Sequence, residues 1–227
     1  MNHFVLSAAL SSLFAFTAAV FTWLKNPSRR LNQISGLYWF SMAFWAFFVG
    51  TQPYIIELFS AFWWGFFLLL GCTFIPVLLF HFVISWTRQN TPVLRKTLAI
   101  SYGMTVLFNL LNLWTTSFTN GTSYRDVYAY PTPAALFSLY FVLFVVLVVW
   151  STLLLIQHLP KLPLKKQQVL KVWIATHTLA YLGGMDNFLI MIDVRISPLY
   201  PFGIYFIPLY ASMAIYAAWR YHLPDSA

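Results

Sequence analysis

The chain has 227 residues, of which 60% are hydrophobic, 20% are aromatic and only 8% carry a formal charge. An ordinary soluble domain has about 25% charged residues, so this composition indicates an integral membrane protein. The net charge is +8, but the basic residues lie in short clusters between apolar runs, which is typical of a membrane topology signal and not of a nucleic-acid-binding surface. The only cysteine, Cys72, excludes an intramolecular disulfide framework and a thiol-only metal site.

Apolar runs long enough to cross a bilayer follow one another along the whole chain. A membrane-spanning helix needs about 20 predominantly apolar residues, and seven runs satisfy this condition. They lie at approximately residues 4–24, 32–51, 58–84, 97–116, 133–157, 168–192 and 202–221. Because the connections are short, the sequence predicts an all-α membrane protein, with residues 1–227 forming a single bundle of seven transmembrane helices. The first run lacks the basic start of a signal peptide, so we expect it to remain as a span.

The distribution of lysine and arginine predicts an orientation. Of the 13 basic residues, only Arg125 and Arg195 lie on one side of the predicted spans. The others are on the opposite side: Lys25, Arg29, Arg30, Arg88, Arg95, Lys96, Lys161, Lys165, Lys166, Lys171 and Arg220. Since lysine and arginine concentrate on the cytoplasmic side of membrane proteins, we expect the N-terminus outside and the C-terminus in the cytoplasm.

Two of the connections have local signals of their own. Pro27 blocks helix continuation and pushes Asn26 out of the α region, which predicts a tight turn between the first two spans. In the outer connection 116–131, Asn120-Gly121 is typical of a type I′ turn. Serine, threonine and aromatic residues flank this pair, so the sequence predicts a small β-hairpin lid over the outer mouth of the bundle.

The sixth apolar run, Gln168 to Ile192, contains Asp186, the only acid that lies inside an apolar span. An ionisable side chain at membrane depth costs roughly 2.5–3.5 kcal/mol, so we expect Asp186 to face the bundle interior, a partner or a water-filled cavity. Asn187 follows it directly. His177 lies near the middle of the same run, where a lone buried histidine is usually a packing residue and a proton-sensing role is the alternative.

The fourth run carries polar residues on a single helical face. They are spaced three or four residues apart: Ser101, Thr105, Asn109, Asn112 and Thr116. One interpretation is that they tie this helix to its neighbours by interhelical hydrogen bonds, typically worth about 0.6 kcal/mol each. The other is a pocket wall, because Asn109 and Asn112 lie in the outer half of their span, at the same height as Asp186 and Asn187.

The third run enters from the outer side with Trp63 and Trp64 and contains Pro76 at mid-membrane. Proline removes one hydrogen bond from the preceding turn, so we expect a kink at Pro76 that acts either as a hinge or only as shape. His81 lies near the inner end of this run and is expected to be a hydrogen-bonded packing residue.

The residue pattern gives no indication of an enzyme. The five histidines, at positions 3, 81, 158, 177 and 222, form no His-x-x-x-His or Glu-x-x-His pair, so no metal site is predicted. No span contains paired carboxylates, and no Gly-rich phosphate loop is present. A retinal pigment needs a lysine within a late span, and the last two runs have none beyond Lys171. We therefore expect no cofactor and no catalytic residues.

Several short strings in a defined order resemble the seven-helix N-terminal sensor region of bacterial histidine kinases. They are Asn26-Pro27-Ser28-Arg29-Arg30-Leu31-Asn32, Trp45, Phe74-Ile75-Pro76 with His81-Phe82, Gln167-Gln168, Gly183-Gly184 with Asn187-Phe188, Tyr200-Pro201, and Arg220-Tyr221-His222-Leu223. The resemblance extends from about Phe16 to Asp225. It implies a receptor module of a two-component system in the bacterial inner membrane, whose seventh helix leads into a cytoplasmic output segment such as a histidine kinase or a cyclase.

The end of the chain departs from that pattern. The sequence stops at Ala227, just after Leu223-Pro224-Asp225, so the output domain is expected either to have been cut away or to be a separate partner. Pro224 interrupts a continuous helix, which argues against direct helical transmission.

Together these observations predict a sensory domain that binds a small or amphipathic ligand, entering from the outer side or laterally from membrane lipid. The pocket is expected between the third, fourth, sixth and seventh spans. Its predicted polar contacts are Asp186, Asn187, Asn109 and Asn112, and its predicted apolar walls are Trp63, Trp64 and Tyr205. Ligand binding would shift the bundle between two packings and move the last span, and a homodimer is left open.

Two other classes of protein fit parts of the pattern. A small-solute carrier, a proton-coupled carrier or a channel would use Asp186 as its coupling site, but it predicts a polar path to both faces. The inner halves of the spans offer little beyond His81, Ser85, Gln157 and His177, which favours a receptor. A structural subunit predicts a large apolar face committed to another protein and no cavity of ligand size.

Overall fold

The structure is a computed structural model that describes residues 3–55, 60–89, 91–125, 128–192, 194 and 202–221. For residues 52–55, 124–125, 128, 186, 190 and 202 this description extends to the backbone only. The elements in chain order are α1 His3–Lys25, α2 Arg30–Ile55, α3 Ala61–Trp86, α4 Pro92–Trp114, β1 Thr119–Arg125, β2 Tyr128–Pro133, α5 Ala135–His158, η1 Leu159–Lys161, α6 Leu164–Met191, η2 Phe202–Phe206 and α7 Ile207–Arg220. Each of the seven predicted apolar runs therefore contains one α-helix.

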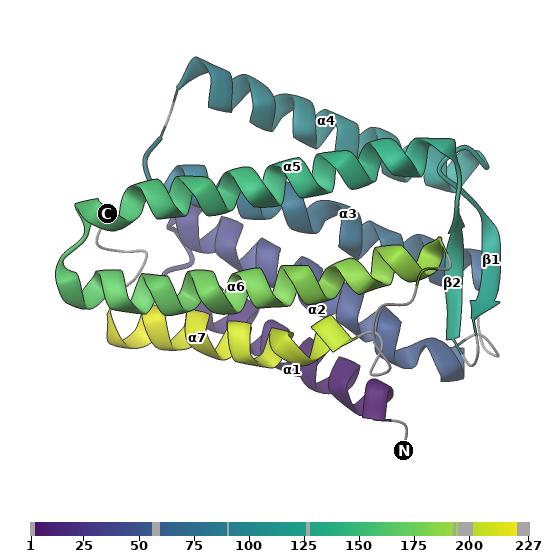
Figure 1. The fold of residues 1–227 in the computed structure, drawn as a ribbon, viewed down its shortest axis with the longest axis horizontal. Helices are drawn as coiled ribbons and strands as arrows, with labels where there is room; N and C mark the ends of the chain where they lie inside the picture. Colours follow the sequence, from purple (N-terminus) through teal and green to yellow (C-terminus); the bar gives the residue numbers. More distant parts are fainter. Residues whose placement is uncertain are drawn as a thin grey trace.

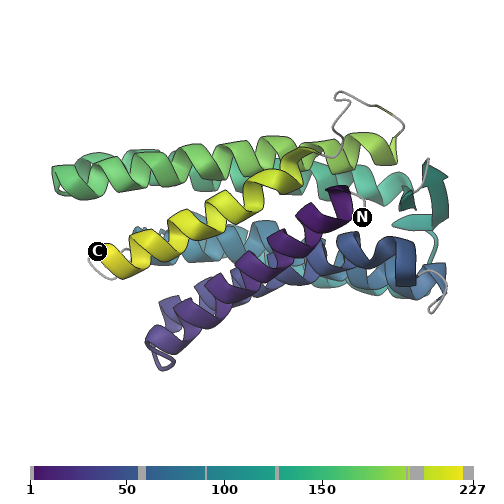
Figure 2. The same cartoon turned by 90° about the horizontal axis from the view of Figure 1, so that it is seen from below.

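The helices lie side by side and run up and down along one long axis (Figures 1 and 2). The α1–α2, α3–α4 and α5–α6 connections and the C-terminal end of α7 lie at one end of the bundle (the basic end). The start of α1 and the β1–β2 hairpin lie at the other (the hairpin end). The clusters of lysine and arginine in these connections are therefore gathered at the basic end.

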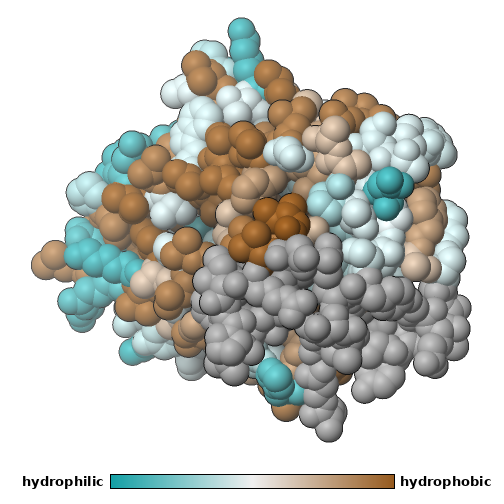
Figure 3. Space-filling model, turned by 45° about the vertical axis from the view of Figure 1, so that its right-hand side comes forward, coloured by the Kyte–Doolittle hydropathy of each residue, from teal (hydrophilic) through white to brown (hydrophobic). Residues whose placement is uncertain are grey.

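Five helices of the described chain are long and apolar enough to cross a membrane: α1, α2 from Arg30 to Thr51, α3, α4, and α5 extended to Lys161. Their outer surfaces are apolar too, since side chains such as Leu13, Ile100 and Trp114 are between 59% and 75% exposed. Brown, apolar residues also cover much of the described surface in Figure 3. In a soluble protein such a surface would be an aggregation liability, whereas in a bilayer it faces lipid. The composition and the helices are thus those of a multi-pass membrane protein.

The ends of the helices follow from local chemistry. The α1–α2 turn is as tight as Asn26-Pro27 predicts, and the Arg29 N–H donates to the Asn26 carbonyl at 3.1 Å. Ser60 and Thr91 cap the N-termini of α3 and α4 by accepting bonds from backbone N–H groups three residues ahead. In α4 the next residue is Pro92, whose missing N–H costs nothing in the first helical turn.

The predicted hairpin is present, but its turn lies elsewhere than the sequence indicates. Strands β1 and β2 pair antiparallel, and their last matched pair is Arg125 with Tyr128. Asn120 and Gly121 instead lie within β1, where the register shifts between Thr119 and Thr122. Gly121 has a φ of 77°, as at the first position of a glycine-type bulge. The Asn-Gly pair thus bends the strand and does not close the hairpin.

The hairpin is fixed to the bundle by aromatic packing at its base. Phe118 is fully buried and lies with its ring centroid 5.3 Å from Phe108 of α4 and 5.5 Å from Phe137 of α5. The Phe118 carbonyl accepts a hydrogen bond from the Ala134 N–H just before α5. Tyr130 of β2 is buried, which places β2 against the ends of α5 and α6.

Candidate functional site

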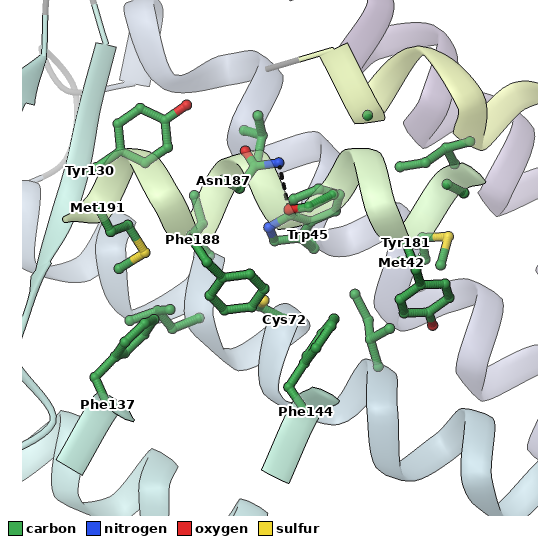
Figure 4. A pocket seen from close by; sticks show the side chains of 18 residues that line it. Met42, Trp45, Cys72, Tyr130, Phe137, Phe144, Tyr181, Asn187, Phe188 and Met191 are labelled. Atoms are coloured by element: carbon green, nitrogen blue, oxygen red, sulfur yellow. Dashed lines mark hydrogen bonds between the residues drawn. The ribbon is translucent and has the colours of Figure 1, made fainter. Parts of the chain in front are cut away.

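A partly enclosed cavity lies inside the half of the bundle next to the hairpin. Its walls come from α2, α3, α5 and α6, and β2, η2 and the start of α7 contribute the rest. Eighteen of the residues that the structure describes line it, and none of these carries a formal charge (Figure 4). Aromatic rings dominate: Phe137 and Phe144 point from α5 towards Phe188 on α6, while Trp45 and Cys72 form the opposite wall.

The cavity is narrow. The centre of a water-sized molecule has about 60 Å³ in which to move inside it. Small-molecule sites generally enclose about 300–1,000 Å³ and are mostly apolar with a few placed polar groups. The cavity has the expected apolar lining but is small, so a ligand larger than a few atoms would have to push its side chains apart.

Asn187 supplies an unsatisfied hydrogen-bond acceptor in this wall. Its side chain is 9% exposed, and its Nδ2 donates to the Gly184 carbonyl at 3.3 Å (Figure 4). That bond fixes the orientation of the amide, because the opposite assignment would place two oxygens against each other. The remaining atom, Oδ1, is buried and has no hydrogen-bond partner among the described residues, as is also true of Asn109 Oδ1, Trp86 Nε1 and both ring nitrogens of His158 outside the cavity. Leaving such an acceptor unpaired costs about 1–3 kcal/mol, so it favours any molecule that brings a donor.

The contact between Gly183 and Gly203 closes this part of the cavity. The backbones of α6 and η2 touch there, and a Cβ added to either glycine would overlap the backbone of the other. Only residues without a side chain permit this approach. The next residue, Gly184, lines the cavity, and a Cβ added to it would meet no heavy atom within 4 Å. The adjacent glycines therefore have different roles: Gly183 contacts η2, and Gly184 faces open space.

A buried chain of hydrogen bonds starts at the cavity wall and reaches α7. We call it the tyrosine–histidine cluster. Its members, from α2, α5, α6 and α7, are Tyr38, Thr152, His177, Tyr181 and Tyr210. The hydroxyl of Tyr181, a cavity residue, lies 3.1 Å from that of Tyr38, which donates to the Tyr210 hydroxyl at 3.0 Å. His177 Nδ1 lies 3.1 Å from the Tyr210 hydroxyl and Nε2 lies 3.2 Å from Thr152 Oγ1.

These distances define a consistent set of donors. Because Tyr210 accepts from Tyr38, its own proton is free to be donated to His177 Nδ1. The imidazole is then neutral with its proton on Nε2, which donates to Thr152, and Thr152 donates to the Val148 carbonyl at 2.9 Å. Every polar atom of His177 is thus satisfied. This geometry supports the packing interpretation of the histidine, and proton sensing remains an untested prediction.

The predicted amides of the fourth span lie away from this cavity. Asn109 is buried and donates to Thr73 Oγ1 on α3 at 2.8 Å, and Asn112 accepts from Thr119 Oγ1 on β1 at 2.6 Å. No residue of α4, which is described over its whole length, lines the cavity. The expectation of a hollow shared by Asn187 and these amides therefore differs from the structure. Nearer partners on α3 and the hairpin bind them, as in the interhelical hydrogen-bond interpretation.

The predicted aromatic walls also lie elsewhere. Trp63 is 45% exposed, whereas Trp64 is fully buried and donates from Nε1 to the Phe48 carbonyl at 2.9 Å. Tyr205 is 37% exposed and stacks on His3, with ring centroids 6.2 Å apart. None of the three lines the cavity. Their positions in the sequence place all three towards the hairpin end of the bundle, but the direction of each side chain depends on how its helix is rotated.

The walls that the sequence analysis missed are apolar residues of α2, α3 and α5. Phe137 and Phe144 are seven residues apart on α5 and therefore share a face, which is the only sequence signal that distinguishes them. Since the chain contains 23 phenylalanines, their residue type carries no information about the cavity.

The remaining predicted residues are placed as follows. The side chain of Asp186 lies outside the part of the chain that the structure describes. Pro76 is buried inside α3, which continues as one helix from Ala61 to Trp86, and a hinge there remains a prediction. His81 Nδ1 lies 2.9 Å from the hydroxyl of Tyr102 and so ties α3 to α4.

Among the described residues, no group of three or more His, Cys, Asp or Glu side chains could hold a metal ion. Comparison of the sequence with protein-family models gives no match, and a search of curated proteins finds no significant relative.

Proposed function

We propose that this protein is a membrane-embedded sensory domain that binds a small or amphipathic ligand in the cavity beside Asn187. The observation that carries the proposal is an aromatic cavity near the hairpin end, whose described lining residues are uncharged and include Asn187, with its buried Oδ1 unpaired among the described residues. A structural subunit needs no such cavity. The ligand supplies the donor that the protein itself does not provide.

In this proposal all seven helices cross the bacterial inner membrane, with the hairpin end outside. Helix α7 has 14 residues and η2 has five. At the rises of the two helix types they extend about 21 Å and about 10 Å, which together match a hydrocarbon core about 30 Å thick. The lysine and arginine clusters at the basic end then lie in the cytoplasm, as topology rules require.

The tyrosine–histidine cluster supports signalling from the cavity to α7. Tyr181 is in the cavity wall, and Tyr210 on α7 is two hydrogen bonds away through Tyr38. A ligand that displaces Tyr181 therefore acts on α7, whose C-terminal end at Arg220 lies at the basic end. A cytoplasmic output module such as a histidine kinase, covalently attached or a separate partner, would receive this movement, as the resemblance to kinase sensor regions implies.

The same cluster argues against the alternative of a carrier or channel. A transported solute needs a polar path from the cavity to the basic end. In that direction the cavity is followed by His177, which is fully buried with both ring nitrogens hydrogen-bonded, and by Trp173 stacked on it at 5.9 Å. Packed rings fill most of the interior there, and the small void of about 30 Å³ beside Trp173 is lined mainly by aromatic and alanine side chains.

Native mass spectrometry of the protein purified from its host membrane tests the proposal. We expect a small molecule bound to the wild type and absent from Gly184→Leu, whose new side chain fills the cavity. The matched control is Gly103→Leu, an exposed helix position where an added Cβ also meets no heavy atom within 4 Å. Equal occupancy in the wild type and both variants would show that the cavity is not the binding site.

A further inference from the structure

A groove on the outside of the bundle leads to the cavity. It lies between α5 and α6, the two helices that face the viewer in Figure 1. Its empty space is about 650 Å³, and the centre of a water-sized molecule has about 220 Å³ available, so it is wider than the cavity. Its rim is lipid-facing in a membrane, since Val149 is 51%, Leu153 50% and Leu182 64% exposed.

Two side chains are common to the walls of the groove and the cavity. Phe144 and Tyr181 line both spaces, and their ring centroids are 5.9 Å apart. Each has two rotatable bonds, and the only hydrogen bond that moving this pair would break is the one between the hydroxyls of Tyr181 and Tyr38.

We propose that the ligand is an uncharged single-chain amphiphile dissolved in the bilayer, which enters between α5 and α6 by displacing Phe144 and Tyr181. Its alkyl chain occupies the narrow cavity, and a hydroxyl or amide N–H near its end donates to Asn187 Oδ1. This inference rests on the proposed function and adds to it the chemical class of the ligand and its route.

The cavity itself indicates the ligand class. Its small accessible volume, about 60 Å³, favours a single alkyl chain over a bulkier molecule. None of the described lining residues is charged, which disfavours an ionised head group, because a charge buried without a partner is strongly penalised. An alkyl chain gains little on moving from bilayer to an apolar cavity, since both are equally dry. The hydrogen bond to Asn187 is therefore the interaction that makes the cavity preferable to lipid for such a molecule.

The ligand class can be tested by photolabelling the full chain in lipid nanodiscs. The probe is a twelve-carbon alcohol with a diazirine in its chain, and its control is the corresponding methyl ether, which has no donor. Irradiation should label the cavity residues Cys72, Phe137 and Phe188, as mapped by peptide mass spectrometry. We expect labelling to fall about tenfold with the ether and in Asn187→Leu, because a similarly shaped side chain without the acceptor removes the hydrogen bond.

A matched pair of substitutions on α5 tests the route. Val149 lines the groove and Val142, two turns earlier on the same face, lines neither space, and their exposures are 51% and 56%. We expect Val149→Trp to slow the rise of labelling severalfold after the probe is added, with an unchanged final level. Val142→Trp should behave as the wild type, because its indole points into lipid away from the groove.

Each outcome has a defined meaning. Equal labelling by alcohol and ether, or labelling confined to outer helix surfaces, would overturn the ligand class. Equal rates for Val149→Trp and Val142→Trp would overturn the route. Neither result bears on the native ligand detected by mass spectrometry and lost in Gly184→Leu, so the proposed function stands or falls separately.

Discussion

The cavity and the tyrosine–histidine cluster are neighbours that share Tyr181, yet their buried polar atoms differ in whether they have hydrogen-bond partners. In the cluster, each hydroxyl and each ring nitrogen has a partner within 3.2 Å. In the cavity, Asn187 Oδ1 is buried and has none. Buried polar groups are nearly always hydrogen-bonded, so the satisfied cluster is expected to hold the helices together. Asn109 Oδ1, Trp86 Nε1 and both ring nitrogens of His158 are also unpaired among the described residues, but only Asn187 combines such an atom with a place in the cavity wall. That combination is what distinguishes the proposed binding region from the cluster.

The glycine contact that closes the cavity should give the largest effect on stability. Gly183→Leu places a side chain against the backbone of Gly203 and forces α6 away from η2. We expect the free energy of unfolding to fall by more than about 3 kcal/mol, as for severe overpacking. Denaturant titration in mixed micelles measures this free energy. The control is the next residue: Gly184→Leu should be neutral or stabilising by up to about 1 kcal/mol, because leucine is a better helix former than glycine. A similar loss of stability in both variants would contradict the contact between Gly183 and Gly203.

The cluster should be the next most sensitive region. His177→Leu leaves the hydroxyls of Tyr210 and Thr152 without their shared partner, and we expect a loss of about 2–3 kcal/mol in the same titration. His81→Leu is the matched control, since His81 is half-buried and has a single side-chain bond, to Tyr102. That variant should lose about 1 kcal/mol. If the two substitutions lower the free energy of unfolding equally, the cluster stabilises the bundle no more than an ordinary contact between helices does.

The helices and several of their ends could be predicted from the sequence, because apolar length, capping residues and Asn26-Pro27 act locally. Four of the five residues of the predicted polar face on the fourth span are buried, namely Ser101, Thr105, Asn109 and Asn112. The fifth, Thr116, was predicted wrongly, since it is exposed and lies beyond the end of α4 at Trp114. The partners of the buried four could not be predicted, because a period of 3.6 residues shows which side chains share a face and not which helix they meet. For the same reason the cavity lies towards the end of the bundle where the sequence predicts a pocket, while most of its lining residues could not be predicted.

The hairpin illustrates a second limit. Asn120-Gly121 has the backbone preference of a type I′ turn, but the same positive φ serves a bulge. The burial of Phe118 between α4 and α5 fixes the start of β1, and the strand then needs the bend at Gly121 to reach α3, where Thr122 contacts the Ala61 carbonyl. A long-range contact thus decided between two local structures that the sequence allows.

The unpaired acceptor should give a smaller effect of opposite sign. Asn187→Leu removes an unsatisfied buried oxygen, so the ligand-free protein should become more stable by about 1 kcal/mol. Asn112→Leu removes the acceptor of the Thr119 hydroxyl and should cost about 1 kcal/mol. Thermal unfolding of the two variants in nanodiscs compares them directly. A loss of stability in Asn187→Leu equal to that in Asn112→Leu would mean that the amide holds the bundle and is not reserved for a ligand.

The smallest change in stability, and the most informative about signalling, is expected for Tyr38→Phe. This variant keeps the ring and removes the hydroxyl that joins Tyr181 to Tyr210, so the free energy of unfolding should fall by only about 1 kcal/mol.

Hydrogen–deuterium exchange tests whether the cluster couples the cavity to α7. If it does, the twelve-carbon alcohol should alter exchange in α7 of the wild type. This response should disappear in Tyr38→Phe, while photolabelling of the cavity persists. Tyr140→Phe is the control, because its hydroxyl bonds to Cys72 within the α3–α5 contact and has no link to α7. A response of α7 that survives in Tyr38→Phe would show that the cluster is a structural bond between helices and that the signal, if there is one, travels by another contact such as Gly183 with Gly203.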